Sequence, residues 1–108
     1  MDAEDGAGAS RSRSRARRRI ERRLLEVHAR LVAARAELEV LVHQADALRD
    51  QAEEMRIRVL VSETPGADRE WREADGHARR LEERRAQKRA EIAQLVATQD
   101  DLLGQLVV

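Results

Sequence analysis

The fold is set by residues 20–59, whose sequence is IERRLLEVHARLVAARAELEVLVHQADALRDQAEEMRIRV. Apolar residues recur here in alternating steps of four and three, at Ile20, Leu24, Val27, Leu31, Ala34, Leu38, Leu41, Ala45, Leu48, Ala52, Met55 and Val59. This spacing is the heptad repeat of a coiled coil, with Leu24 at an a position and Ile20 at a d position. The pattern predicts one long helix with a single apolar seam.

The first seam ends near the only proline of the chain, Pro65. Proline disfavours helical geometry in the residue before it, whereas Thr64 can cap a new helix that has Pro65 at its first position. A second seam then runs through Trp71, Ala74, Ala78, Leu81, Arg85, Lys88, Ile92, Leu95, Gln99, Leu102 and Leu106. The sequence therefore predicts two helices, roughly residues 16–62 and 66–106, with a turn near residues 63–67.

We expect an all-α fold in which these two helices form an antiparallel coiled-coil hairpin. Antiparallel coiled coils pair a with d, so the numbers of paired residues have a constant sum. A sum of 133 faces large residues with small ones near the turn, as with Ala52 and Leu81, and sets the basic residues 79–89 against the acids of residues 44–54. Arg85 and Lys88, the two cations in the second seam, should then reach the acids of the first helix and help to fix the register.

The residues before the first seam have a different composition. Residues 1–10 are small and acidic, and a Ser/Arg tract follows them. Because this segment has little apolar surface to bury, we expect a disordered tail over residues 1–15 and the helical hairpin over residues 16–108.

Arginine is concentrated in residues 11–23, which hold eight arginines and one acid. If the helix extends back this far, Arg11, Arg15, Arg18 and Arg22 form one stripe that could follow a phosphate backbone. The candidate nucleic-acid contacts are Arg11, Arg15, Arg18, Arg19, Arg22 and Arg23, and binding would be nonspecific because the tract has no Asn, Gln or aromatic residue. A solubilising tail and a contact for an acidic protein are the alternatives.

The turn region is acidic and carries the only aromatic residue, Trp71. The 133 register places Trp71 beside Ser62, so we expect a partly exposed ring bordered by Glu63, Asp68 and Glu70, which would suit a basic and apolar partner. The alternatives are that the ring packs over the end of the seam and that the acids only favour the start of the second helix.

An acidic tip on a helical hairpin resembles, in outline, the factors that insert a coiled coil into the secondary channel of RNA polymerase. The resemblance covers shape and charge, and it implies a regulator whose tip enters a larger machine.

Apolar residues also lie outside the two seams, among them Val42, Val96 and Leu103. A two-stranded coiled coil needs only its a and d positions, so these flanking residues predict burial on a second side. We expect two hairpins to pack as a homodimeric four-helix bundle, with a groove for the helix of another protein as the alternative.

Composition argues against several classes of function. The chain has no cysteine, and its apolar runs are far shorter than the ~20 residues that span a bilayer. Its N-terminus lacks the apolar segment of a secretory signal, so we expect a cytoplasmic protein with no membrane partner. No pattern of catalytic or metal-binding residues stands out, and we expect neither an enzyme nor a cofactor. The sequence favours a non-enzymatic interaction module, a scaffold or regulatory adaptor for an unidentified protein partner.

Overall fold

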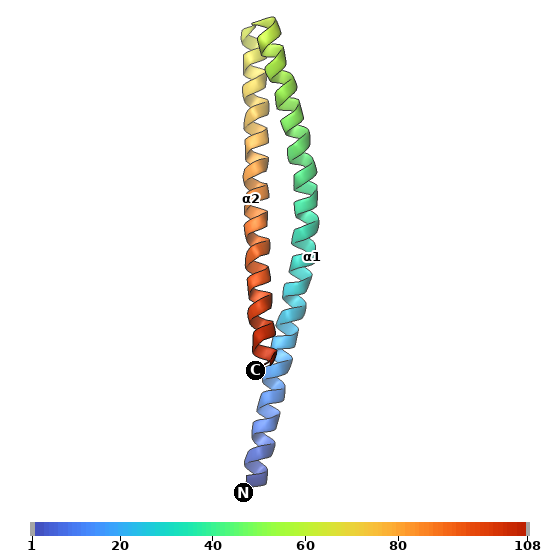
Figure 1. Ribbon diagram of the computed structural model, residues 1–108, viewed down its shortest axis with the longest axis vertical. Helices are drawn as coiled ribbons and strands as arrows, with labels where there is room; N and C mark the ends of the chain where they lie inside the picture. The colour runs from blue at the N-terminus through green and yellow to red at the C-terminus, as the bar shows by residue number, and fades with distance from the viewer. Residues whose placement is uncertain (1, 108) are drawn as a thin grey trace. The chain divides into compact units, whose positions relative to one another are not determined.

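The computed structural model describes residues 2–107, and the side chains of residues 6–107 among them. Its two α-helices are α1 (Asp2–Ser62) and α2 (Pro65–Val107), and the described residues contain no strand (Figure 1). The prediction of an all-α chain with two long helices is therefore confirmed.

The helix α1 continues through residues 2–15, where the sequence predicts a disordered tail. All described side chains of residues 6–19 are exposed, so burial does not explain the helix. Arginine, which occupies six of the nine positions from residue 11 to residue 19, has high intrinsic helix propensity. Extending an existing helix also costs much less than nucleating a new one.

The turn between the helices is two residues long. Glu63 has a φ of 50° and donates a backbone hydrogen bond to the carbonyl of Val59, with 3.2 Å between N and O. The hydroxyl of Thr64 accepts a hydrogen bond from the backbone N–H of Ala67 at 3.3 Å, and Pro65 is the first helical residue. The predicted cap at Thr64 is confirmed, since its side chain satisfies one of the free donors at the start of α2.

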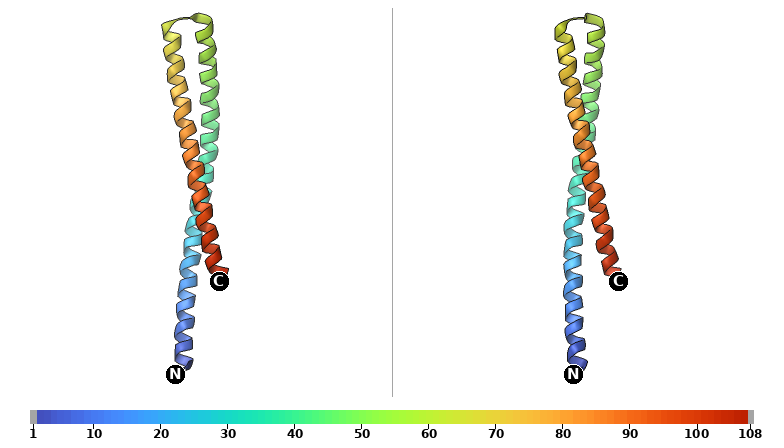
Figure 2. Two further views of the ribbon diagram at one scale, coloured as in Figure 1. Left: turned by 60° about the vertical axis from the view of Figure 1, so that its left-hand side comes forward. Right: turned by 90° about the vertical axis from the view of Figure 1, so that its left-hand side faces the viewer.

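The chain divides into two compact units, which we describe separately. Unit 1 comprises Met1–Ala33 and Ile92–Val108, and unit 2 comprises Ala34–Glu91. Unit 2 is an antiparallel helical hairpin, in which the end of α1 and the start of α2 run side by side below the turn (Figure 2). Unit 1 pairs the earlier part of α1 with the end of α2 around Val27, Leu31 and Leu102.

The seams follow the predicted positions. Every a and d residue of α1 from Ile20 to Val59 is buried or half-buried, and so is every seam residue of α2 from Trp71 to Leu106. Leu31 and Leu102 are the largest fully buried side chains among the described residues, at 1% and 2% exposure. Outside the seam, Val42 is the only residue of α1 with a described side chain that is not exposed.

The register differs from the prediction by one heptad, as unit 2 shows. Lys88 Nζ lies 2.6 Å from a carboxylate oxygen of Glu37. The 133 register would place Lys88 opposite Ala45, which is eight residues from Glu37 and thus about 12 Å away along the helix. Lowering the sum to 126 puts Lys88 level with Leu38, next to Glu37, and it puts Ala45 opposite Leu81 instead of Ala52.

Unit 1 shows the same shift independently. Ile20 lines one hollow together with Gln105 and Leu106. The 133 register pairs Leu106 with Val27 and leaves Ile20 beyond the end of the chain. A heptad repeat specifies which face of each helix is buried, but a shift of seven residues buries the same faces. The two-residue turn therefore chooses the register, because it keeps the ends of α1 and α2 nearly level.

Candidate interaction surfaces

Two cations occupy the seam of α2 in unit 2, and both reach acids. The guanidinium of Arg85 lies 4.0 Å from Asp46 of α1 and 3.8 Å from Glu82 of its own helix. The ammonium of Lys88 lies 2.6 Å from Glu37 of α1 and 2.7 Å from Glu91. The predicted contact of both cations with acids of the first helix is confirmed.

These cations are partly withdrawn from solvent, with about a fifth of each side chain exposed. The hydrogen bonds from Lys88 to Glu37 and Glu91 raise the pKa of the lysine above its ordinary value of 10.5, because both carboxylates favour the charged form. Arg49 of α1 also pairs with Glu82 of α2, so charged groups from both helices join across this layer. These ion pairs make the layer a structural contact between the two helices, in which the Nε atom of Arg85 is buried without a hydrogen-bond partner.

The three acids predicted to border Trp71 differ in their exposure and in their contacts. Asp68 is half-buried and pairs with Arg72 at 3.1 Å, whereas Glu63 and Glu70 are exposed. Glu70 lines a hollow at the turn that it shares with Ile57 and Val61 of α1. The three acids thus do not form a single ring.

Trp71 lies one heptad deeper than the 133 register predicts. It is half-buried and lines a separate hollow with Ala52, Arg56 and Asp75, rather than lying beside Ser62. In the observed register its level on α1 is that of Met55, a half-buried seam residue. The ring therefore belongs to a seam layer and is covered on the side of α1.

An apolar surface near the turn was missed by the sequence analysis. Ile57, Leu60 and Val61 are 57%, 72% and 81% exposed, and their spacing places them on one side of α1. We call these three residues the tip patch. The hollow beside it has a volume of about 490 Å³. The signal in the sequence is the run from Arg56 to Val61, in which the seam uses only Val59.

The flanking apolar residues predicted to pack on a second copy differ in exposure. Val42 is half-buried in unit 2, and Val96 is half-buried against the core of unit 1. Leu103 is 46% exposed, and two residues on α1 of the same unit, Leu25 and Val32, are 70% and 55% exposed. Unit 1 therefore presents apolar side chains from both of its helices.

The six predicted nucleic-acid contacts are all exposed, and all lie within α1: Arg11, Arg15, Arg18, Arg19, Arg22 and Arg23. Arg18 donates a hydrogen bond from Nε to the carbonyl of Ser14 at 3.4 Å, and the neighbouring Arg17 pairs with Glu21 at 3.2 Å. The sequence predicts one stripe of arginines if the helix extends back to residue 11. The helix α1 does extend that far, so Arg11, Arg15, Arg18 and Arg22 lie along one side of it.

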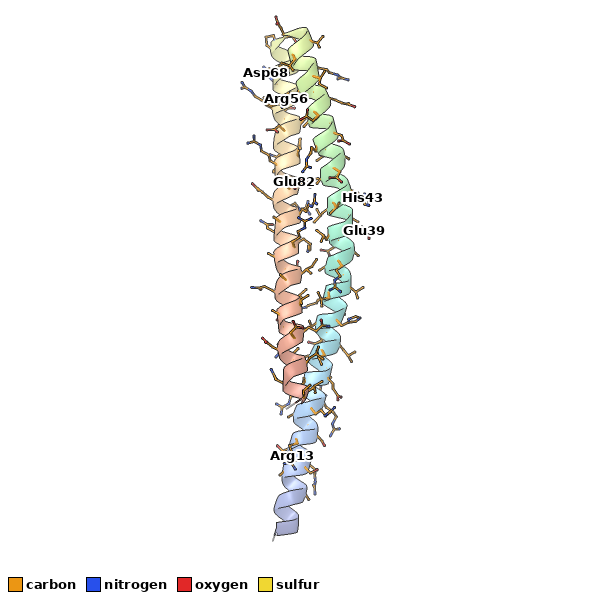
Figure 3. The ribbon with its side chains drawn as sticks, in the orientation of Figure 1. Arg13, Glu39, His43, Arg56, Asp68 and Glu82 are labelled. Carbon is orange, nitrogen blue, oxygen red and sulfur yellow. The ribbon has the colours of Figure 1, made fainter. Side chains whose placement is uncertain are left out.

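Other side chains show no converging arrangement in the described part of the chain. Residues 6–107 contain no group of three or more His, Cys, Asp or Glu side chains placed to hold a metal ion. Glu39 and His43 lie on the side of α1 turned away from α2 (Figure 3). Neither described helix contains a stretch apolar enough to cross a membrane.

Comparison with known proteins found no matching family model, no matching curated protein and no matching solved structure.

Proposed function

We propose that this chain is a non-enzymatic coiled-coil interaction module, a scaffold or regulatory adaptor that binds protein in the cytoplasm. The observation that carries the proposal is the set of large apolar side chains that the seams leave exposed. The tip patch offers three of them in unit 2, and Leu25, Val32 and Leu103 offer three in unit 1. Contiguous exposed apolar residues with polar neighbours are typical of protein interaction sites.

The tip patch supports binding of a partner other than a second copy. Leu60 and Val61 are among the most exposed apolar residues of the described chain, and the hollow beside them is bordered by Thr64 and Glu70. This combination offers an apolar contact with a polar rim, which is the usual organisation of a protein interface.

A capture experiment tests the tip patch. The full chain is immobilised and compared with the variant Leu60→Ser/Val61→Ser and with the control Gln51→Ser/Glu54→Ser, which changes exposed polar residues of α1. We expect proteins of the native host that bind the wild type and the control to be lost from the tip variant. Calorimetry with the purified partner should then give a Kd at least about tenfold weaker for the tip variant. Equal capture by all three chains would contradict the proposal for this surface.

A second candidate function is nonspecific nucleic-acid binding by the arginines of α1. The observation in its favour is that the helix extends through residues 11–23 and leaves its arginines exposed. Such binding should weaken as salt increases. On duplex DNA, the logarithm of the binding constant should fall against the logarithm of the salt concentration with a slope of about −0.9 for each phosphate contact. Replacing Arg15, Arg19, Arg22 and Arg23 by glutamine should reduce this slope. Wild-type DNA affinity that does not depend on salt would contradict the candidate.

A further inference from the structure

The large apolar side chains that unit 1 leaves exposed lie on one of its two flanks. In the observed register, residues 93–107 of α2 lie level with residues 19–33 of α1. A position that directly follows a seam residue is called b after an a residue and e after a d residue. In this part of α1 the b and e positions hold Glu21, Leu25, His28 and Val32, and all four side chains are exposed.

The b and e positions of α2 lie on the same flank of unit 1. In an antiparallel coiled coil the e positions of the two helices are neighbours, and the ion pair between the e residues Arg49 and Glu82 shows this relation in unit 2. The corresponding positions in unit 1 are Ala93, Val96, Asp100, Leu103 and Val107, of which Val96 is half-buried and the others are exposed. We call these nine residues of α1 and α2 the unit 1 face.

The exposed large apolar residues are confined to this face. Within the described part of unit 1 they are Leu25, Val32, Leu103 and Val107, at 70%, 55%, 46% and 88% exposure. The opposite flank is formed by the residues that directly precede seam residues, and in residues 19–33 and 93–107 alanine is its only apolar residue type. Unit 1 therefore has one flank that favours burial and one flank that suits water.

The two helices of unit 1 carry opposite charges. Residues 19–33 of α1 hold four arginines and two glutamates, a net charge of +2, whereas residues 93–107 of α2 hold two aspartates and no base, a net charge of −2. Such a face is complementary to a copy of itself that presents α2 to α1 and α1 to α2. A copy turned the other way would set α1 against α1 and bring like charges together.

We propose that the unit 1 face binds a second copy of the chain about a two-fold axis parallel to the helices of unit 1, so that α1 of each copy packs on α2 of the other. This axis leaves each residue at its own level along the helices. Val32 then faces Val96 of the second copy, and Leu25 faces Leu103, with a difference in level of about 3 Å in each pair. Each contact occurs twice, because the same surface is used by both copies.

The other members of the face fit the same arrangement. His28 meets Asp100 of the second copy at the level between the two apolar pairs, where an imidazole N–H can donate a hydrogen bond to the carboxylate. Glu21 and Val107 lie at one end of the paired segments and Ala93 lies at the other, so these three residues form the rim. The centre of the interface therefore buries no carboxylate without a partner.

Introduced cysteines test the arrangement, because the chain has no cysteine of its own. The variants Leu25→Cys and Leu103→Cys are refolded together and oxidised mildly. The mixture should give a disulfide-linked dimer, whereas each variant alone should run as a monomer under denaturing conditions, because the two-fold axis places equivalent helices diagonally in the bundle. Gln105→Cys, on the opposite flank, is the control and should not link to Leu25→Cys. Linkage of Leu25→Cys with itself would indicate α1 on α1 and overturn the proposal, and so would failure of the mixture to react.

Sedimentation equilibrium tests whether the interface forms. The wild type should sediment as twice the 12.3 kDa chain, and Leu25→Ser/Leu103→Ser should weaken association at least about tenfold. Gln94→Ser/Gln105→Ser changes exposed residues of the opposite flank and should associate like the wild type, with circular dichroism confirming equal helix content in the three chains. A wild type that stays monomeric at ~100 μM, well above the Kd of a stable dimer, overturns the inference.

A charge exchange tests which helices meet. Asp100→Arg should weaken association, because it places a base of α2 against the basic α1 of the second copy, and His28→Asp/Asp100→Arg should restore most of the affinity. An exchange variant that binds no tighter than Asp100→Arg would contradict the pairing of α1 with α2. This inference rests on the proposed interaction function and names the partner for the surface on unit 1. The tip patch experiment changes residues of unit 2 alone, so its outcome is separate from that of the dimer tests.

Discussion

Lys88 of α2 and Glu37 of α1 form an ion pair, with 2.6 Å between Nζ and the carboxylate oxygen. This contact distinguishes two registers that the heptad pattern alone treats as equal. In the observed register the lysine needs to extend only across the seam. The 133 register would instead place Glu37 about 12 Å along the helix from the level of Lys88. The pair therefore stabilises the register that the two-residue turn favours.

The register itself can be tested by crosslinking within one chain. Ala45→Cys with Leu81→Cys should form a disulfide readily, because these residues face each other when paired numbers sum to 126. Ala52→Cys with Leu81→Cys should react poorly, since the two positions lie about one heptad apart along the helix. Non-reducing electrophoresis and peptide mass mapping measure both reactions. Faster linkage of Ala52→Cys with Leu81→Cys would support the 133 register instead.

Replacing the seam cations should separate stability from register. Arg85→Leu/Lys88→Leu is expected to raise the unfolding free energy by about 1 kcal/mol, because apolar residues often stabilise a core more than ion pairs do. The same variant should increase the reaction of the second cysteine pair while the first pair still reacts faster, since the register loses its polar contacts but keeps its two-residue turn. Arg89→Leu, at an exposed position, is the control and should keep the selectivity. Unchanged selectivity in the double variant would show that the turn alone sets the register.

Much of the fold follows from the sequence because heptads report burial directly. Each seam residue from Ile20 to Val59 is buried or half-buried as predicted, and the cap at Thr64 is where the Pro65 signal places it. The register was wrong by one heptad because a seven-residue shift buries the same residues. Turn length was the missing information, and it depends on Glu63 adopting a backbone conformation that its residue type does not favour.

The exposure of the candidate surfaces was harder to predict than the seams. Sequence patterns show which residues leave the seam, but not how far neighbouring side chains cover them. The sequence predicts Val42 and Val96 on a face that only a second chain covers, and both are half-buried within the hairpin. It predicts no role for Leu60 and Val61, which are 72% and 81% exposed. Trp71 was assigned to the tip only because the predicted register was too long.

Alkaline pH should destabilise the chain through Lys88. The carboxylates of Glu37 and Glu91 raise its pKa above the ordinary 10.5, so its contribution is fully present below that pH and is lost as pH rises through the higher pKa of the folded state. Lys88 is the only lysine, and the chain has no tyrosine or cysteine, which are the other residue types that ordinarily titrate near that pH. Thermal unfolding between about pH 8 and pH 12 should show a falling midpoint for the wild type and a nearly constant one for Lys88→Gln. Parallel curves for the two proteins would contradict this assignment.

The conformation of Glu63 should cost stability. Its φ of 50° lies in the left-handed region, which glycine and asparagine adopt more readily than other residues. Glu63→Gly should therefore raise the unfolding free energy by about 1 kcal/mol, as measured by urea denaturation. Glu63→Ala removes the same charge but keeps the strain, so it should show little of this gain. An equal gain in both variants would assign the effect to the acid instead of the backbone.

Trp71 should report the packing of the seam near the turn. Its half-buried ring contacts the hollow lined by Ala52 and Arg56, so its emission should be shifted to the blue of free tryptophan and only partly quenched by acrylamide. Trp71→Ala should lower the unfolding free energy by about 1–3 kcal/mol, less than for a fully buried ring, whereas Trp71→Leu should lose less because it refills most of the apolar volume. Leu60→Ser, in the exposed tip patch, should leave stability nearly unchanged. Emission like that of free tryptophan, together with an unchanged stability of Trp71→Ala, would instead place the ring in solvent at the tip and return it to the candidate partner contacts.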